Sequence, residues 1–178
     1  DSNVKHELAT GEYAQRRRQC LSATKILGIE SLRELSPAEL PAALAELDTT
    51  VGRRVRHVVT ENSRTTAAAD ALRSADWPRL GGLMFESHDS LRDDYEVSCW
   101  ELDALDEAAR HIGLTGGVVG SRMTGGGFGG CTVSLVERTQ ASDVLNSIVA
   151  QCRRTGLCEP RGFVTTPADG AQALLGPT

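Results

Sequence analysis

Hydrophobic residues recur every three or four positions along most of this chain, a spacing typical of amphipathic helices. The longest such segment runs from about Val51 to Arg73. Its core face is expected to carry Val51, Val55, Val58, Asn62, Thr65, Ala69 and Leu72, and its outer face Arg53, Arg54, Glu61, Arg64 and Asp70. Further helices are expected over about 8–27, 36–47, 76–91, 98–112 and 142–156, with a last turn or two at 168–175.

Start and stop signals bound several of these helices. Capping boxes at Ser36–Glu39 and Ser98–Glu101 predict two helix starts, and Asp76 and Ser142 are expected to cap two others. Gly28, Gly113 and Gly156 follow the last periodic residues of three helices, where glycine commonly ends a helix. The pair Gly81-Gly82 lies inside a helix at a cost of about 1 kcal/mol each. Another backbone is therefore expected to pack closely there.

In two short segments, one on each side of a glycine cluster, hydrophobic and polar residues alternate instead. Val118, Val119 and Met123 precede it, and Val133, Leu135 and Val136 follow it, which predicts strand, loop and strand. Seven of the chain's eighteen glycines lie between 117 and 130, and five fall in the six positions 125–130. Ordered glycine costs conformational entropy, so such a cluster indicates that something approaches the backbone closely.

We favour an anion-binding loop over the main alternative, a wide hairpin turn, which also uses glycine but rarely five of them. Phosphate is the expected anion. Gly125, Gly127 and Gly130 match G-x-G-x-x-G, but a strand follows where the dinucleotide fingerprint requires a helix. The absence of a following Gly-Lys-Ser/Thr excludes a P-loop.

A third strand is expected over Gly162–Thr166, after the helix near 142–156. Strand, strand, helix and strand is the order in which a split β-α-β unit ends, as in ferredoxin-like folds. The first strand of such a unit would lie before Asp1. The fold class predicted is therefore α+β, an antiparallel sheet with helices packed on it.

Composition narrows the classes of function. The net charge of −5 argues against a general nucleic-acid binder, and no apolar run approaches a membrane span. Five cysteines without C-x-x-C spacing suggest neither a disulfide framework nor a zinc site, which fits a reducing cytoplasm.

Few side chains stand out as chemical candidates. A tyrosine on an apolar helical stripe, such as Tyr13, is more often a core or interface residue than a ligand contact. The triplet Arg16-Arg17-Arg18 is expected to be a solvated face. His88 and the run 92–94 are interpreted as a hydrogen-bonded corner that joins two helices.

Four stretches together resemble the galactokinases, a branch of the GHMP small-molecule kinases. They are Asn3-Val-Lys-His6, Glu12-Tyr13 with Arg16-Arg-Arg-Gln-Cys20, Leu83 to Cys99 with the core Met-Phe-Glu-Ser-His-Asp-Ser-Leu, and Gly120-Ser-Arg-Met-Thr-Gly-Gly-Gly-Phe-Gly-Gly-Cys131. The resemblance runs from Ser2 to about Gln172 and is to the C-terminal half of such an enzyme. The family's Gly-Leu-Ser-Ser phosphate loop, galactose-recognition motif and catalytic aspartate and arginine are not in this chain.

The resemblance implies transfer of the ATP γ-phosphoryl group to the anomeric hydroxyl of galactose in the intact protein. Tyr13 would contact galactose, Gly125, Gly126, Gly127, Gly129 and Gly130 would lie beside the nucleotide phosphates, and Lys5 would be a basic residue near them. The cofactors implied are ATP and Mg²⁺, with the metal ligands and base outside this chain. The partners implied are galactose, ATP and the protein's own N-terminal domain, with residues 1–178 forming the C-terminal domain. Neither nucleic acid nor a membrane is expected.

Three alternatives stay open. Kinases for N-acetylgalactosamine or arabinose share much of this half, and some galactokinase-like proteins are non-catalytic galactose and ATP sensors in gene regulation. A free-standing regulatory module of split β-α-β type is the third.

Overall fold

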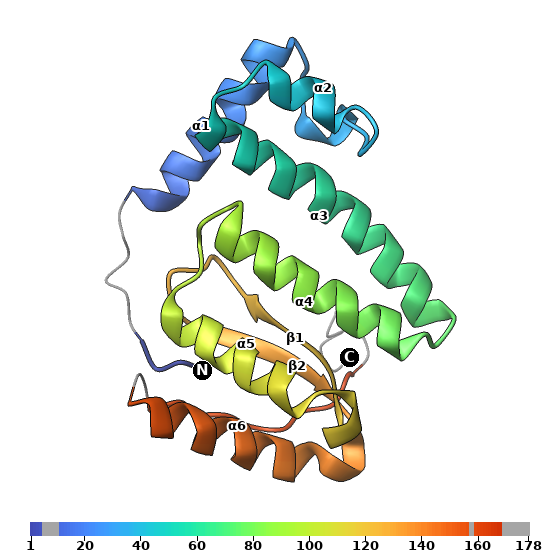
Figure 1. The fold of residues 1–178 in the computed structure, drawn as a ribbon, viewed down its shortest axis with the longest axis vertical. Helices are drawn as coiled ribbons and strands as arrows, with labels where there is room; N and C mark the ends of the chain where they lie inside the picture. Colours follow the sequence, from blue (N-terminus) through green and yellow to red (C-terminus); the bar gives the residue numbers. More distant parts are fainter. Residues whose placement is uncertain (5–10, 157–158, 169–178) are drawn as a thin grey trace, which may run out of the picture.

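The protein is an α+β structure in which helices pack on a two-stranded antiparallel sheet, as predicted (Figure 1). The computed structural model describes residues 1–4, 11–156 and 159–168. In chain order the elements are α1 (Glu12–Leu27), η1 (Leu32–Glu34), α2 (Leu40–Ala45), α3 (Thr49–Arg73), α4 (Trp77–Asp93), α5 (Trp100–Ile112), η2 (Leu114–Gly116), β1 (Val118–Thr124), β2 (Cys131–Val136), η3 (Arg138–Gln140) and α6 (Ala141–Thr155).

Strands β1 and β2 form the antiparallel pair predicted around the glycine cluster. Their register runs from Val118 opposite Val136 to Thr124 opposite Cys131, with an irregularity between Val118 and Gly120. The glycine loop, residues 125–130, therefore connects the two strands at one end of the sheet.

Helix α4 lies along the edge of β1 that faces away from β2. The amide of Met123 donates to His88 of α4 at 3.0 Å. A Cβ added to Gly81 of α4 would lie 1.7 Å from the carbonyl oxygen of Val119, so the helix and strand backbones approach as closely as predicted. The prediction holds for Gly81 and is wrong for Gly82, whose Cβ would meet no atom within 4 Å.

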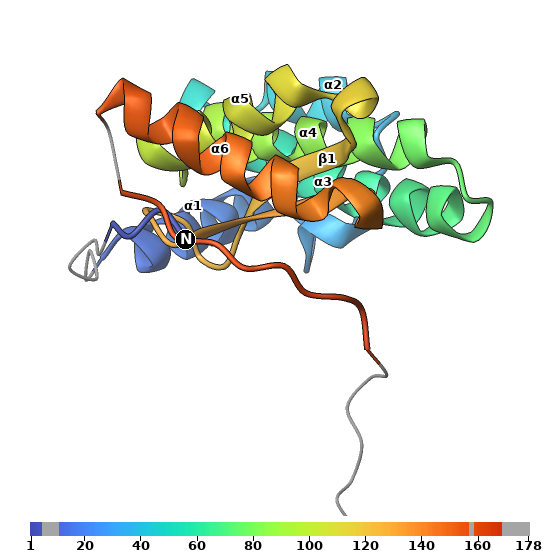
Figure 2. The ribbon, with the colours of Figure 1, turned by 90° about the horizontal axis from the view of Figure 1, so that it is seen from below.

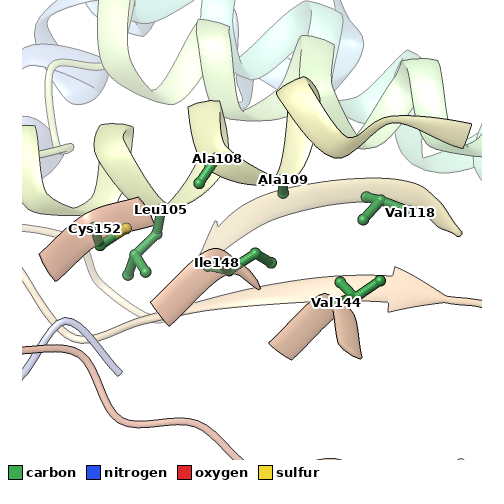
Figure 3. Packing of buried hydrophobic residues seen from close by; sticks show 7 residues of the cluster. All are labelled: Leu105, Ala108, Ala109, Val118, Val144, Ile148 and Cys152. Carbon is green, nitrogen blue, oxygen red and sulfur yellow. The ribbon is translucent and has the colours of Figure 1, made fainter. Parts of the chain in front are cut away.

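Helices α5 and α6 pack together on one side of the strands (Figures 1 and 2). Figure 3 shows the cluster that joins them to β1, which consists of Leu105, Ala108, Ala109, Val118, Val144, Ile148 and Cys152. A second core lies among α1, η1, α2 and α3 around Ala23, Leu32 and Val55. Helix α3 packs on α4 and so joins this helical group to the sheet (Figure 1).

Helix ends agree with the sequence better than helix starts. Gly28, Gly113 and Gly156 are all C-cap residues with positive φ, and Asp76 accepts from the Arg79 amide at the start of α4. The helix expected from Leu8 begins at Glu12 in the described part of the chain.

Three predicted starts were misplaced. Ser36 and Glu39 do bond to each other, at 2.9 and 2.6 Å, but they close a turn before α2. Ser98 does not cap α5, because its hydroxyl donates to Asp103 and Cys99 is the N-cap residue. Ser142 lies within α6, which begins at Ala141. A capping signature needs only two side chains, so it also occurs in turns and tertiary contacts.

The strand predicted over Gly162–Thr166 is not formed, and residues 159–168 adopt neither helix nor strand. A strand requires a hydrogen-bonded neighbouring strand, and in the described part of the chain the backbone of this segment pairs with Asp1 through Arg161. Asp1 and Arg161 exchange two bonds, Arg161 N to Asp1 O at 2.9 Å and Asp1 N to Arg161 O at 2.8 Å. The turn predicted at 168–175 lies outside the described residues except for Ala168.

Candidate functional site

The glycine loop is built on left-handed backbone. Four of its glycines have φ in that region: Gly125 (85°), Gly127 (83°), Gly129 (129°) and Gly130 (89°). Side chains with a Cβ rarely adopt such angles, so part of the glycine content serves the turn itself. On the outer side, a Cβ at Gly125, Gly126 or Gly130 would meet nothing within 4 Å. The backbone on that side is open to a ligand.

The inner side of the loop rests on residues 94–98, the segment between α4 and α5 that we call the connector. The Phe128 amide donates to the Val97 carbonyl at 2.6 Å. A Cβ on Gly127 would lie 2.2 Å from that same oxygen. The close approach predicted from the glycines is therefore made, at Gly127, by the protein's own backbone.

His88 fixes the end of β1 from which the loop departs. Its side chain is fully buried, and its Nδ1 accepts the Met123 amide at 3.0 Å. The ring proton must then be on Nε2, which donates to Asp103 Oδ1 at 3.0 Å. Ser98 also donates to that oxygen, at 2.6 Å. The predicted corner between two helices is confirmed for His88, whereas Arg92 pairs with Asp89 and Asp93 of its own helix. The contact of His88 with β1 is an addition that periodicity could not reveal.

Two buried arginines hold the connector from the opposite side. Arg16 of α1 is 9% exposed and donates to the carbonyls of Tyr95 and Glu96, both at 2.6 Å. Arg54 of α3 is 2% exposed and donates to the Asp94 carbonyl at 2.6 Å and to the Glu96 carboxylate. The prediction that all three arginines of the triplet are solvated was therefore wrong for Arg16, whereas Arg17 and Arg18 are exposed as predicted.

Arg54 was likewise wrongly assigned to the outer face of its helix. A buried guanidinium is stable only where acceptors replace its water, and the connector's carbonyls supply them.

Tyr13 does not lie on a buried stripe, because 75% of it is exposed on α1. It is one turn from Arg16 and near the connector residue Tyr95. Burial raises the pKa of Tyr95 to about 12, and the neighbouring Cys20 and Tyr13 add to this effect. Tyr13 is thus free to meet a ligand, close to residues that also support the glycine loop. Lys5, the other predicted site residue, lies outside the described residues.

His57 supports the connector from α3. Its ring stacks on Tyr95 with 4.5 Å between centroids, and its Nδ1 is 3.0 Å from the Ser90 hydroxyl. Burial lowers the pKa of His57 to about 4, although the Glu61 and Asp94 carboxylates oppose the shift and the Arg64 and Arg122 guanidinia reinforce it. The imidazole is therefore neutral in the folded protein near neutral pH.

This low pKa predicts acid sensitivity. Below pH 6.5 His57 is protonated in the unfolded state, but in the folded state it stays neutral until about pH 4. The free energy of unfolding should therefore fall as the pH falls from 6.5 to about 4. Unfolding by urea at pH 7, 6 and 5 measures the slope. His57→Gln should flatten it, whereas His111→Gln, at an exposed histidine, should not. An equal slope in both variants would contradict the assignment to His57.

Over the described ranges, no three carboxylate, histidine or cysteine side chains gather closely enough to hold a metal ion. Within the same residues, no helix is both long and apolar enough to cross a membrane.

Comparison with known proteins gives consistent matches. The sequence profile described as "GHMP kinases C terminal" matches residues 68–154. The galactokinases of Bos taurus and Homo sapiens are each 51% identical to this chain over 174 residues, covering 98% of it and 43% of their own length. The galactokinase of Mannheimia succiniciproducens is 46% identical over 96% of this chain and 44% of its own.

A solved structure, Lactococcus lactis galactokinase complexed with galactose, is similar with a TM-score of 0.82 and 36% identity. The match covers 88% of this chain and 41% of that one. The chain thus spans less than half the length of the relatives it matches.

Proposed function

Because this chain matches the GHMP kinase C-terminal profile over residues 68–154 and the C-terminal part of the galactokinases over nearly its whole length, we propose that the intact protein is a galactokinase of the GHMP kinase family. It transfers the γ-phosphoryl group of ATP to the anomeric hydroxyl of galactose. The observation that carries this proposal is identity of about half the residues to galactokinases along 98% of the chain. We also propose a cytoplasmic location, which fits a reaction that consumes ATP.

The glycine loop is proposed to lie beside the nucleotide phosphates. Phosphoryl transfer depends mainly on positioning and on stabilising the charge of the transferred group. Gly125, Gly126 and Gly130 leave open space on the outer side of the loop, and backbone amides there can face an anion without hindrance from side chains. Gly127 and Gly129 serve the loop's conformation, and Lys5 is proposed to add positive charge nearby.

An N-terminal domain is proposed to supply what this chain does not hold. The base and the ligands of the Mg²⁺ that accompanies ATP are proposed to come from there. A strand preceding Asp1 would extend the sheet. Two observations support this extension. The Ser2 amide donates to the Gly130 carbonyl at 2.8 Å, and Asp1 pairs with Arg161, so residues 1 and 2 lie between the start of β2 and residues 161–168.

Assay of the intact protein with ATP and separate sugars tests the proposal. Phosphorylation of galactose well above that of N-acetylgalactosamine or arabinose is expected. Preference for either of the other sugars would identify a related kinase. Tight binding of galactose and ATP without turnover would identify a sensor and refute the catalytic assignment.

Tyr13→Phe should weaken the use of galactose and not of ATP. The substitution removes only a hydroxyl from an exposed side chain, so the loss of one sugar hydrogen bond predicts about 0.5–1.5 kcal/mol in kcat/KM for galactose. Separate titrations of the two substrates measure this. Because Tyr13 is 75% exposed, the melting temperature should not change, and a defect confined to ATP would contradict its role.

A further inference from the structure

The connector has the glycine loop on one side and α1 on the other. The carbonyls of Tyr95 and Glu96 accept from Arg16, and the next carbonyl along the chain, that of Val97, accepts from Phe128 in the loop. Three consecutive carbonyl groups thus join Arg16 of the helix to Phe128 of the loop, two residues that are more than a hundred positions apart in sequence.

The backbone of the connector has little freedom to adjust. Glu96 has a φ of 54°, in the left-handed region that residues other than glycine rarely adopt. Its carboxylate is also held by Arg53 at 2.7 Å and by Arg54. A displacement of the Tyr95 and Glu96 carbonyls must therefore move Val97 rather than be absorbed between them.

Arg16 also contacts the loop directly. Its guanidinium carbon lies 5.7 Å from the centre of the Phe128 ring, within the range of a cation–π contact. The same side chain therefore meets both the connector and the residue that the connector holds. Arg17, the next residue on α1, is exposed.

We infer that Arg16 is a positioning residue that couples the sugar side of the site, on α1 near Tyr13, to the glycine loop on the nucleotide side. The inference rests on the proposed function for the identity of the two ligands. When α1 settles against bound galactose, Arg16 sets the connector carbonyls, and Val97 and Phe128 set the loop for the nucleotide. Binding of either ligand then favours the other, and the coupling is reciprocal.

The guanidinium fork is what makes this link. Its Nε and Nη2 reach two neighbouring carbonyls at once, whereas a lysine ammonium is a compact point charge that cannot span both in fixed geometry. Arg16→Lys therefore keeps the charge and the helix but loses the rigid two-carbonyl contact.

The test uses the full-length protein and measures the Kd of a non-hydrolysable ATP analogue with and without saturating galactose. The ratio of the two Kd values is the coupling factor, expected to be about fivefold or more in the unmodified protein. Arg16→Lys should bring this factor close to one. Arg17→Lys, the matched control at an exposed arginine, should leave it unchanged.

Phe128→Leu provides a second variant that breaks the link at the loop side and should also lower the factor. A coupling factor of one in the unmodified protein would overturn the inference. So would an Arg16→Lys protein that binds both ligands more weakly but keeps the full factor, because that pattern is expected of a structural role alone. Absence of any galactose phosphorylation by the unmodified protein would instead count against the proposed function.

Discussion

Replacing Gly81 with alanine is expected to destabilise the protein by about 3 kcal/mol or more, the upper range for overpacking in a core. The new Cβ would lie 1.7 Å from the Val119 carbonyl oxygen and 2.7 Å from its carbon. Both obstacles are backbone atoms, so α4 and β1 must separate. Because a domain's total stability is only about 5–15 kcal/mol, the loss should be visible in urea unfolding and in the yield of folded protein.

Gly82→Ala is the matched control for Gly81→Ala. It lies next to Gly81 in the same helix, but its added Cβ would meet nothing within 4 Å. Alanine is the better helix former by about 1 kcal/mol, so this variant should be as stable as the unmodified protein or more so. Equal losses for the two variants would show that helix propensity, and not contact with β1, determines the effect.

Gly127→Val is expected to reduce nucleotide affinity and turnover more than tenfold, at least about 1.4 kcal/mol. The backbone there has a φ of 83°, and the Cβ would lie 2.2 Å from the Val97 oxygen. A branched side chain must therefore push the loop off the connector and displace the amides proposed to meet phosphate. Steady-state constants for ATP in the intact protein measure the effect, together with the melting temperature, which should also fall.

Gly126→Val separates the phosphate role from packing. A Cβ at Gly126 meets no atom within 4 Å, and its φ lies outside the left-handed region, so the fold should be kept. If phosphate approaches the outer side of the loop, this variant should still lose nucleotide affinity at an unchanged melting temperature. If the steady-state constants for ATP do not change in this variant, the phosphate role is refuted, and the loop's glycines serve only backbone conformation and packing.

Features that depend on neighbours in sequence were predictable. The strand–loop–strand unit was correct because alternation and glycine content are local properties of residues 118–136. In α5 the buried residues Leu102, Leu105 and Ala109 follow the three- and four-residue spacing from which the helices were predicted. Helix ends at Gly113 and Gly156 followed from the conformational freedom of glycine, which needs no tertiary partner.

The third strand and the helix starts were not predictable in this way. Gly162–Thr166 has strand-like residues, but a strand exists only where another strand offers its backbone, and in the described part of the chain the backbone pairing with Asp1 is made by Arg161, just before this segment. Ser98 has the spacing of a cap, yet Asp103 competes for its hydroxyl. Each outcome depends on which partner the folded chain supplies.

The candidate site divides along the same line. The sequence alone determined that a glycine loop joins two strands, and its resemblance to galactokinases pointed to Tyr13 and the loop as site residues. Only the tertiary structure decided that Arg16 and Arg54 are buried and that Tyr13 is exposed. A charged residue on a helix is solvated by default, and what reverses this for Arg16 is a pair of carbonyls 79 and 80 residues away along the chain. The local sequence shows that Arg16 is charged, whereas the carbonyl acceptors that make its burial favourable are brought to it only by folding.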